Sequence, residues 1–221
     1  MNKKLKAVVF DIDGTLTNSI SWLDMTRGLG ASTDEHLSIF EDYIDGRISY
    51  PESKRLLLGL WAKTGNNSRQ FILDMYGAWQ FKHNAKTVIE TIKGRGLRVC
   101  LITGSMDIFA ESVSRYLGVE HYYANTDTTF DENGYLVDYS YVKDQGAKKL
   151  LQFQDFCASQ SLESTDVMAV GNGKNDVKLF VATGRGVLVA DSGNKDLVEK
   201  ARWVIDDLAE LVGIIDGAYE K

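Results

Sequence analysis

The chain has 221 residues, of which 31 are acidic and 25 are basic, so its formal net charge is −6. This acidic balance argues against binding to nucleic acid or to an anionic membrane surface. No stretch approaches the roughly 18 uninterrupted apolar residues of a membrane span, and the apolar run before Asp11 is too short for a signal peptide. We therefore expect a cytoplasmic protein.

Near the N-terminus, the apolar run 7–10 ends abruptly at Asp11 and Asp13, and Gly14 follows. The run predicts a strand that is buried on both faces of a parallel sheet. Because side chains alternate along a strand, both carboxylates should leave on one side at its carboxyl end, where open α/β sheets bind ligands. Gly14 permits a turn with positive φ.

Two carboxylates at this position have a specific chemical use. Together they can hold a hard divalent cation such as Mg²⁺. One carboxylate can also attack phosphorus while its neighbour transfers a proton. The alternative is that Asp11 and Asp13 are ordinary polar residues where the strand passes into a loop, with no function.

Residues 18–83 have helical patterning, with apolar side chains at three- and four-residue spacing. Ser32–Glu35 and Ser49–Glu52 have the form of capping boxes, and Pro51 lies near a first helical position. The segment predicts a small helical cap domain inserted into a core domain of residues 1–17 and 84–221. We expect its aromatic and aliphatic stripes to form its own core rather than a ligand site.

Beyond residue 84, predicted strands and helices alternate. A hairpin is expected over 130–137, around the turn 131–134. Helices are predicted over 85–93, 106–117 and about 147–160, and strands over 98–102, 122–124, 167–170, 186–189 and 203–205. This alternation predicts an α/β fold, a Rossmann-like doubly wound parallel sheet with an inserted helical cap. Cys100 and Cys157 lack CxxC spacing and are expected to be buried thiols.

Polar residues also follow two later strands. Thr103 and Gly104 offer a hydroxyl and turn amides that can hold phosphoryl oxygens. The loop 171–176 supplies Asn172, Asn175 and Asp176, whose oxygens can complete a metal shell. Either segment alone is a weak signal, but both fall at the expected ligand-binding edge of the sheet.

A group of lysines comes before and at the start of the helix predicted near 147. One ammonium group near a transferring phosphoryl group would offset its negative charge. Lys143, Lys148 and Lys149 are the candidates, of which one is expected to matter.

In their order and placement, these motifs resemble the haloacid dehalogenase superfamily, the aspartate-nucleophile phosphohydrolases, over essentially the whole chain. Residues 11–17 look like its first motif, 103–104 its second, a lysine among 143–149 its third, and 171–176 its fourth. The helical insert, the turn 46–50 and the stretch 103–108 look most like the phosphoserine phosphatase branch.

This resemblance implies an enzyme that hydrolyses a small phosphate ester with Mg²⁺. Asp11 would attack phosphorus, while Asp13 would protonate the leaving alcohol and later activate water. Lys148 is chosen over Lys143 and Lys149 because it lies 45 residues after Thr103 and 24 before Asn172, the layout of that branch. The implied metal ligands are Asp11, Asp13, Asn172 and Asp176, and the implied phosphate-binding residues are Thr103, Gly104, Lys148 and Asn175.

The sequence departs from the phosphoserine phosphatase pattern at two positions. Asn172 stands where those enzymes place a metal-binding aspartate, which should weaken Mg²⁺ binding. Ile20 stands where they place a glutamate that receives the substrate's amino group, and an apolar side chain cannot pair with an ammonium group. Arg47 and Arg55 could meet an anionic substrate, although a solvated surface is the simpler role.

The substrate therefore stays open between phosphoserine and another small phosphorylated metabolite. Two other functions also stay open. One is a phosphotransferase or mutase on the same fold, and the other is a binding or regulatory protein on an attenuated phosphatase fold.

Overall fold

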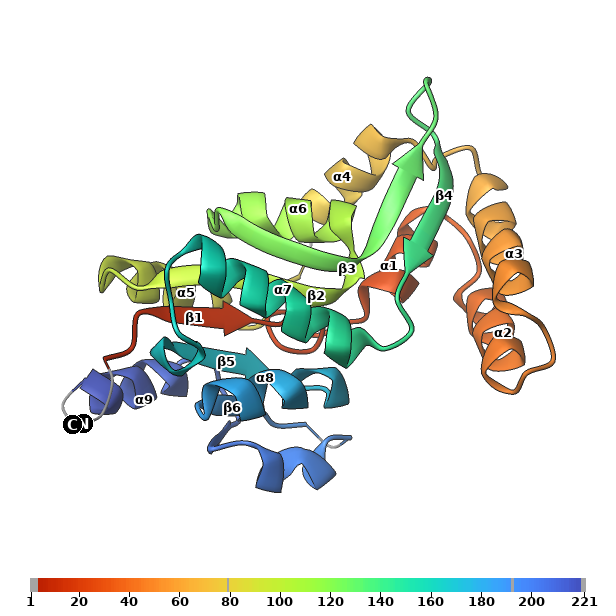
Figure 1. Cartoon of the computed structure of the whole chain (residues 1–221). Coiled ribbons are helices and arrows are strands. Elements are labelled where there is room, and N and C mark those ends of the chain that lie inside the picture. Colours follow the sequence, from red (N-terminus) through yellow and green to blue (C-terminus); the bar gives the residue numbers. More distant parts are fainter. Residues whose placement is uncertain (1–3, 79, 192, 220–221) are drawn as a thin grey trace.

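The computed structural model describes residues 4–78, 80–191 and 193–219. Its centre is a seven-stranded sheet in the order β4-β3-β2-β1-β5-β6-β7 (Figure 1). All neighbouring strands pair in parallel except β4, which is antiparallel to β3 at one edge. The strands are β1 (Ala7–Phe10), β2 (Arg98–Met106), β3 (His121–Phe130), β4 (Leu136–Tyr141), β5 (Val167–Gly171), β6 (Gly186–Val189) and β7 (Trp203–Ile205).

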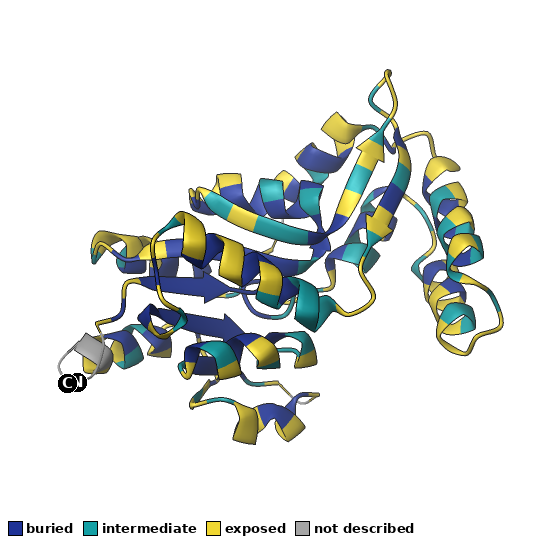
Figure 2. Cartoon of the chain, in the orientation of Figure 1, coloured by how far each residue is buried: buried dark blue, intermediate teal, exposed yellow. Residues whose placement is uncertain are grey.

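Strand β1 lies at the middle of the sheet and is wholly buried, as its continuous apolar run predicts (Figure 2). Val8 and Phe10 belong to one apolar cluster, whereas Ala7 and Val9 belong to a second cluster on the opposite face. The first cluster includes side chains of α5 (Ala85–Gly94), α6 (Asp107–Leu117) and α9 (Glu210–Tyr219), and the second those of α7 (Gln145–Ser159) and α8 (Val177–Thr183). The predicted doubly wound α/β fold is confirmed.

Most predicted elements occur, but β2 and β3 are longer than predicted, and α8 and α9 were not predicted. Strand β3 continues through the polar residues 125–129, where no apolar run signals a strand. It does so because β4 pairs with it from Thr126↔Tyr141 to Phe130↔Leu136. The hairpin turn is closed by Asp131, whose Oδ1 accepts hydrogen bonds from the backbone N–H groups of Asn133 and Tyr135.

Four helices lie between β1 and α5 and form the cap region, namely α1 (Ser21–Gly28), α2 (Thr33–Ile44), α3 (Tyr50–Ala62) and α4 (Arg69–Gly77). Ser32 and Ser49 cap α2 and α3, as predicted, because their hydroxyls accept hydrogen bonds from the backbone N–H groups of Glu35 and Glu52.

No helix in the described ranges is long and apolar enough to cross a lipid bilayer. Cys100 and Cys157 are buried free thiols, as expected.

The cap region does not pack only on itself. The β3–β4 hairpin extends beyond the rest of the sheet toward α1 and α3 (Figure 1). Tyr139 of β4 contacts Trp22 and Trp61 of the cap, with ring centroids 5.3 Å and 5.9 Å apart. Buried cap side chains such as Met25 and Trp61 belong to the same apolar cluster as Val8. The expectation that the stripes form a separate cap core therefore needs correction, because strands of the sheet complete that core.

A polar network lies inside the cap. The Thr26 hydroxyl accepts a hydrogen bond of 2.8 Å from Trp61 Nε1 and lies 2.6 Å from His36 Nδ1. His36 is buried, and burial lowers its pKa to about 4. The folded cap therefore holds His36 neutral near pH 7.

Stability should fall in weak acid because of His36. The unfolded chain takes up the proton near the ordinary value of 6.5, before the folded chain does. The stabilisation is complete above pH 6.5 and is lost toward pH 4, by at most about 3 kcal/mol. In urea unfolding, the stability advantage of the wild type over His36→Asn should narrow across this range, and a constant advantage would contradict the prediction.

Candidate active site

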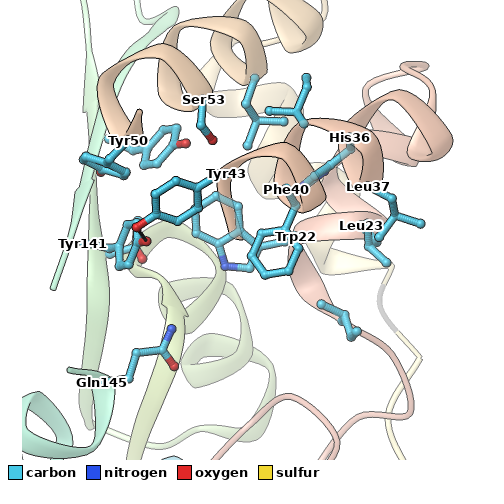
Figure 3. Close-up of a pocket in the computed structure, with 15 residues that line it drawn as sticks. Trp22, Leu23, His36, Leu37, Phe40, Tyr43, Tyr50, Ser53, Tyr141 and Gln145 are labelled. Carbon is cyan, nitrogen blue, oxygen red and sulfur yellow. Dashed lines mark hydrogen bonds between the residues drawn. The ribbon is translucent and has the colours of Figure 1, made fainter. Parts of the chain in front are cut away.

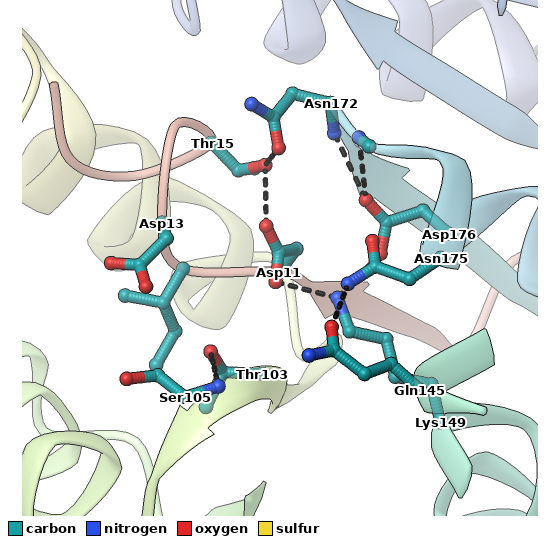
Figure 4. Close-up of polar contacts among 12 residues, drawn as sticks. Asp11, Asp13, Thr15, Thr103, Ser105, Gln145, Lys149, Asn172, Asn175 and Asp176 are labelled. Atoms are coloured by element: carbon teal, nitrogen blue, oxygen red, sulfur yellow. Dashed lines mark hydrogen bonds and ion pairs between the residues drawn. The ribbon is translucent and has the colours of Figure 1, made fainter. Parts of the chain in front are cut away.

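A buried ion cluster lies at the carboxyl end of the central strands. Asp11 follows β1, and Asp176 closes a short 3-10 turn after β5. Lys149 of α7 reaches between them, with Nζ 2.6 Å from Asp11 Oδ1 and 2.6 Å from Asp176 Oδ1 (Figure 4). The Lys149 side chain is 0% exposed. One buried cation thus bridges two carboxylates, and the charged cluster keeps a net negative charge that a metal ion could offset.

The pKa values reflect this balance. Burial raises the pKa of Asp11 to about 6, against the opposing effect of the Lys149 charge. Burial by itself would lower the pKa of Lys149, but the charges of Asp11 and Asp176 outweigh it and raise that pKa above its ordinary value. Lys149 therefore remains an ammonium group at any physiological pH.

The choice of Lys148 as the site lysine is corrected by this geometry. Lys148 is only half-buried and Lys143 is exposed, whereas Lys149 faces the sheet. Adjacent helix positions differ by about 100° in direction, so they cannot both point at Asp11. The sequence did hold the signal, because Lys149, Phe153 and Phe156 share one helical face and both phenylalanines are buried in the core.

The loop after β5 is folded around Asp176. Its Oδ2 accepts hydrogen bonds from the backbone N–H groups of Asn172, at 3.1 Å, and Gly173, at 2.9 Å. A Cβ at Gly171 would lie 2.3 Å from Asp176 Oδ2, so glycine is required where the strand meets the loop. Asn194 Nδ2 donates to the Asn172 carbonyl and holds the loop from outside. These bonds fix Asp176 before any ligand arrives.

Asn172 lies against the first motif. Gly14 has φ +74°, as predicted, and a Cβ there would lie 2.0 Å from Asn172 Nδ2. Thr15 Oγ1 lies 3.2 Å from both Asp11 Oδ2 and Asn172 Oδ1. A hydroxyl has one proton, so it can satisfy only one of these oxygens at a time.

This oxygen-rich environment fits a hard cation. The candidate ligands are the carboxylates of Asp11 and Asp176, the amide oxygen of Asn172 and the backbone carbonyl of Asp13, which are the donor types that Mg²⁺ prefers. Within the described residues, no group of three or more His, Cys, Asp or Glu side chains could hold a metal ion. The candidate set is therefore poorer in carboxylates than a site with aspartate at position 172 would be.

Asp13 accepts a set of hydrogen bonds that is separate from the Lys149 cluster. Because β1 ends at Phe10, strand alternation does not extend to Asp13. Its carboxylate instead accepts hydrogen bonds from Ser21 Oγ at 2.6 Å and Ser21 N at 3.2 Å. Burial raises the pKa of Asp13 to about 7, with the charge of Asp11 adding to the effect and the Ser21 hydrogen bonds opposing it. A carboxyl group with this pKa can give and take a proton near neutral pH.

The second motif is joined to the first through Ser21. The Ser105 hydroxyl contacts the Ser21 hydroxyl, and Ser105 N donates to Thr103 Oγ1 at 3.1 Å. Thr103 is buried and pairs with Ala124 of β3, directly before an irregularity in the register of the two strands. The predicted residues Asp13 and Thr103 are thus linked by two serines.

Gly104 and Asn175 meet at one further residue, Gln145. Asn175 Nδ2 donates a 3.0 Å hydrogen bond to Gln145 Oε1, and a Cβ at Gly104 would lie 2.6 Å from that same oxygen. Sequence reasoning placed Thr15 in the first motif without a role, and it missed Gln145, Asn194 and Ser21. No local pattern identifies these three, because their contacts with the site depend on the tertiary fold.

The fold and the arrangement of these polar side chains are those of a known class of proteins. A family model of the haloacid dehalogenase-like hydrolases matches residues 8–180, and the chain belongs to that family. It is 27% identical over 224 residues to the phosphoserine phosphatase of Methanocaldococcus jannaschii, with 97% of this chain and 100% of the relative covered. It is 28% identical over 190 residues to the phosphoserine phosphatase of Albidiferax ferrireducens, with 82% and 77% covered.

A solved structure gives the same fold. The phospho-aspartyl intermediate analogue of phosphoserine phosphatase superposes with a TM-score of 0.72 at 24% identity, and covers 96% of this chain and 99% of that chain. This chain is thus similar to phosphoserine phosphatases over essentially its full length.

Lys149→Met should destabilise the metal-free protein by about 3 kcal/mol or more, because it leaves two buried carboxylates without their cation. Lys148→Met is the matched control on the same helix and should change the free energy of unfolding by less than about 0.5 kcal/mol. Urea unfolding near neutral pH measures both. Equal losses in the two variants would contradict the assignment of Lys149 to the buried cluster.

Proposed function

We propose that this chain is a Mg²⁺-dependent phosphatase that hydrolyses a small phosphate ester through an aspartyl-phosphate on Asp11. The observation that carries the proposal is the buried Asp11 carboxylate. Lys149 holds one of its oxygens at 2.6 Å, and the turn that follows presents Asp13 as a proton carrier. Membership of the haloacid dehalogenase-like hydrolases supports hydrolysis as the reaction.

The reaction would have two halves. In the first, an Asp11 carboxylate oxygen bonds to phosphorus while the bond from phosphorus to the alcohol oxygen breaks, and Asp13 gives its proton to that oxygen. In the second, Asp13 takes a proton from water, the water oxygen bonds to phosphorus, and the Asp11–phosphorus bond breaks. Inorganic phosphate leaves, and both carboxyl groups return to their starting states.

The phosphoryl group would be held at the carboxyl ends of β1 and β2. Lys149 brings a fixed positive charge beside Asp11, which offsets charge on the phosphoryl oxygens. Thr103 and Gly104 contribute a hydroxyl and backbone N–H groups, and Asn175 contributes an amide fixed by Gln145. These groups are positioned before substrate arrives, which lowers the cost of reorganisation during the reaction.

Asp11, Asp176, Asn172 and the Asp13 carbonyl would hold the Mg²⁺. When bound, the ion would draw negative charge from the phosphoryl oxygens and so favour attack by a carboxylate. The net negative charge of the cluster and the shared Thr15 hydroxyl support this assignment.

Phosphoserine is the first substrate to consider, because the relatives named above are phosphoserine phosphatases. Ile20 argues for other esters as well. It is 57% exposed and offers no charge to an amino acid substrate. A small phosphorylated metabolite is the substrate class that fits both observations.

Asp11→Asn should abolish hydrolysis, with a loss of about 10³-fold or more in kcat, because an amide is not a nucleophile toward phosphorus. Phosphate release from a panel of phosphorylated metabolites with Mg²⁺ measures this. Lys148→Met is the control and should retain activity. Equal activity of Asp11→Asn and the wild type would contradict the mechanism, and turnover that requires a second alcohol would indicate a phosphotransferase.

Asn172→Asp should strengthen Mg²⁺ binding, with a roughly tenfold lower Mg²⁺ concentration for half-maximal activity, because it adds a charged ligand. Without metal, the same change should lower stability, because it adds a third carboxylate near Asp11 and Asp176. Thermal unfolding with and without Mg²⁺ gives an independent measurement. A variant whose stability and Mg²⁺ dependence match those of the wild type would exclude Asn172 from the metal shell.

A further inference from the structure

An aromatic pocket of about 310 Å³ lies between the cap helices α1, α2 and α3 and the β3–β4 hairpin (Figure 3). This volume lies within the usual range of small-molecule sites. The rings that line it come from both the cap and the sheet, and include Trp22, Phe40, Tyr43, Tyr50, Tyr139 and Tyr141. The hairpin of the sheet thus forms one wall of the pocket, and the cap helices form most of the rest.

The lining contains no permanent charge. None of the described residues that line the pocket is Asp, Glu, Lys or Arg. His36 belongs to the lining but is neutral near pH 7, since burial lowers its pKa to about 4. The pocket therefore offers no opposite charge to the ammonium or the carboxylate group of an amino acid.

Charged residues near the pocket are already paired. Lys54 Nζ lies 6.0 Å from the Tyr50 ring centroid, but it forms an ion pair of 2.7 Å with Asp138. Arg47 is bound to Asp42 and Asp45. Arg55 is likewise bound to Glu52 on the exposed surface of α3. Arg47 and Arg55, the two candidate partners of an anionic substrate, are thus exposed side chains that pair with carboxylates of the cap.

The pocket adjoins the catalytic groups at two points. Ile20 lines it, and the next residue, Ser21, holds the Asp13 carboxylate with two hydrogen bonds. Gln145 also lines it and accepts the hydrogen bond of Asn175. The alcohol oxygen that Asp13 would protonate would therefore lie toward the pocket.

We propose that this pocket receives the alcohol portion of the substrate, and that this portion is uncharged and apolar, with an aromatic ring as the preferred group. The inference rests on the proposed phosphatase function. Burying the charged carboxylate of an amino acid here without an opposite charge would be costly. A neutral ring would instead extend the edge-to-face packing already present between Tyr50 and Tyr141, whose planes meet at 81°.

Two polar atoms of the lining add a further requirement. The hydroxyl oxygens of Tyr50 and Thr126 are buried and have no hydrogen-bond partner among the described residues. Burying an unpaired hydroxyl is unfavourable, so a ligand with one hydroxyl or carbonyl group would gain from pairing with either of them. The pocket would therefore select for an apolar ligand that carries one such polar group.

The experiment compares two primary alkyl phosphates, whose leaving groups are chemically similar, on the full chain with Mg²⁺. The enzyme should favour 2-phenylethyl phosphate over O-phospho-L-serine by about tenfold or more in catalytic efficiency, kcat/KM, since only the phosphoserine carries charges into the pocket. Methyl phosphate, which has almost no alcohol portion, is the reference substrate.

Phe40→Ala tests the pocket itself, and Ile44→Ala is the matched control. Both side chains are exposed apolar residues of α2, at 53% and 62%, but only Phe40 lines the pocket. Phe40→Ala should lower the preference for 2-phenylethyl phosphate over methyl phosphate by about tenfold. Ile44→Ala should leave that preference unchanged.

A binding measurement separates this inference from the phosphatase proposal. Calorimetric titration of Asp11→Asn with 2-phenylethyl phosphate should show binding that Phe40→Ala weakens. If that holds but no ester is hydrolysed by the wild type, the proposed function fails and the pocket assignment stands. If esters are hydrolysed with a preference for phosphoserine, or Phe40→Ala has no effect on selectivity or binding, the pocket assignment is overturned and the phosphatase stands.

Discussion

The arrangement of the site depends on one buried interaction, the contact of Lys149 with both Asp11 and Asp176 at 2.6 Å. Two carboxylates this close in a dry interior repel each other, and the ammonium group between them compensates both. It also joins the three parts of the fold that matter here, because Asp11 follows β1, Asp176 follows β5 and Lys149 belongs to α7. The same cluster keeps a net negative charge, which is why a cation has a place beside it.

Close backbone approach is the second constraint around that cluster. Gly14 and Gly171 are positions where any side chain would collide with Asn172 or Asp176. The absence of a Cβ at Gly14 lets the first motif lie against Asn172, so that Thr15 lies within reach of both Asp11 and Asn172. At Gly171 it lets the loop after β5 fold around Asp176. The carboxyl end of the central strands is thus built from backbone geometry as much as from acidic side chains.

The cap and the sheet edge together form the remaining part of the site. The β3–β4 hairpin brings Tyr139 and Tyr141 to the aromatic rings of the cap, and Ser21 at the start of α1 holds Asp13. Helix α1 therefore both holds the group that would transfer the proton and lines the pocket that would hold the alcohol. The ion cluster and the aromatic pocket thus differ in composition, since the first is charged and the second has no charged side chain among its lining residues.

The amino-acid sequence by itself determined the α/β alternation, the helical insert, the caps at Ser32 and Ser49, and the acidic strand end, because each depends on local periodicity or on a residue's own conformational preference. It could not select Lys149 over Lys148 by spacing, although the helical face shared with Phe153 and Phe156 carried that information. Only the tertiary structure brought Ser21, Gln145 and the aromatic hairpin to the site. Their roles arise from contacts between segments far apart in the chain, and no local pattern encodes such contacts.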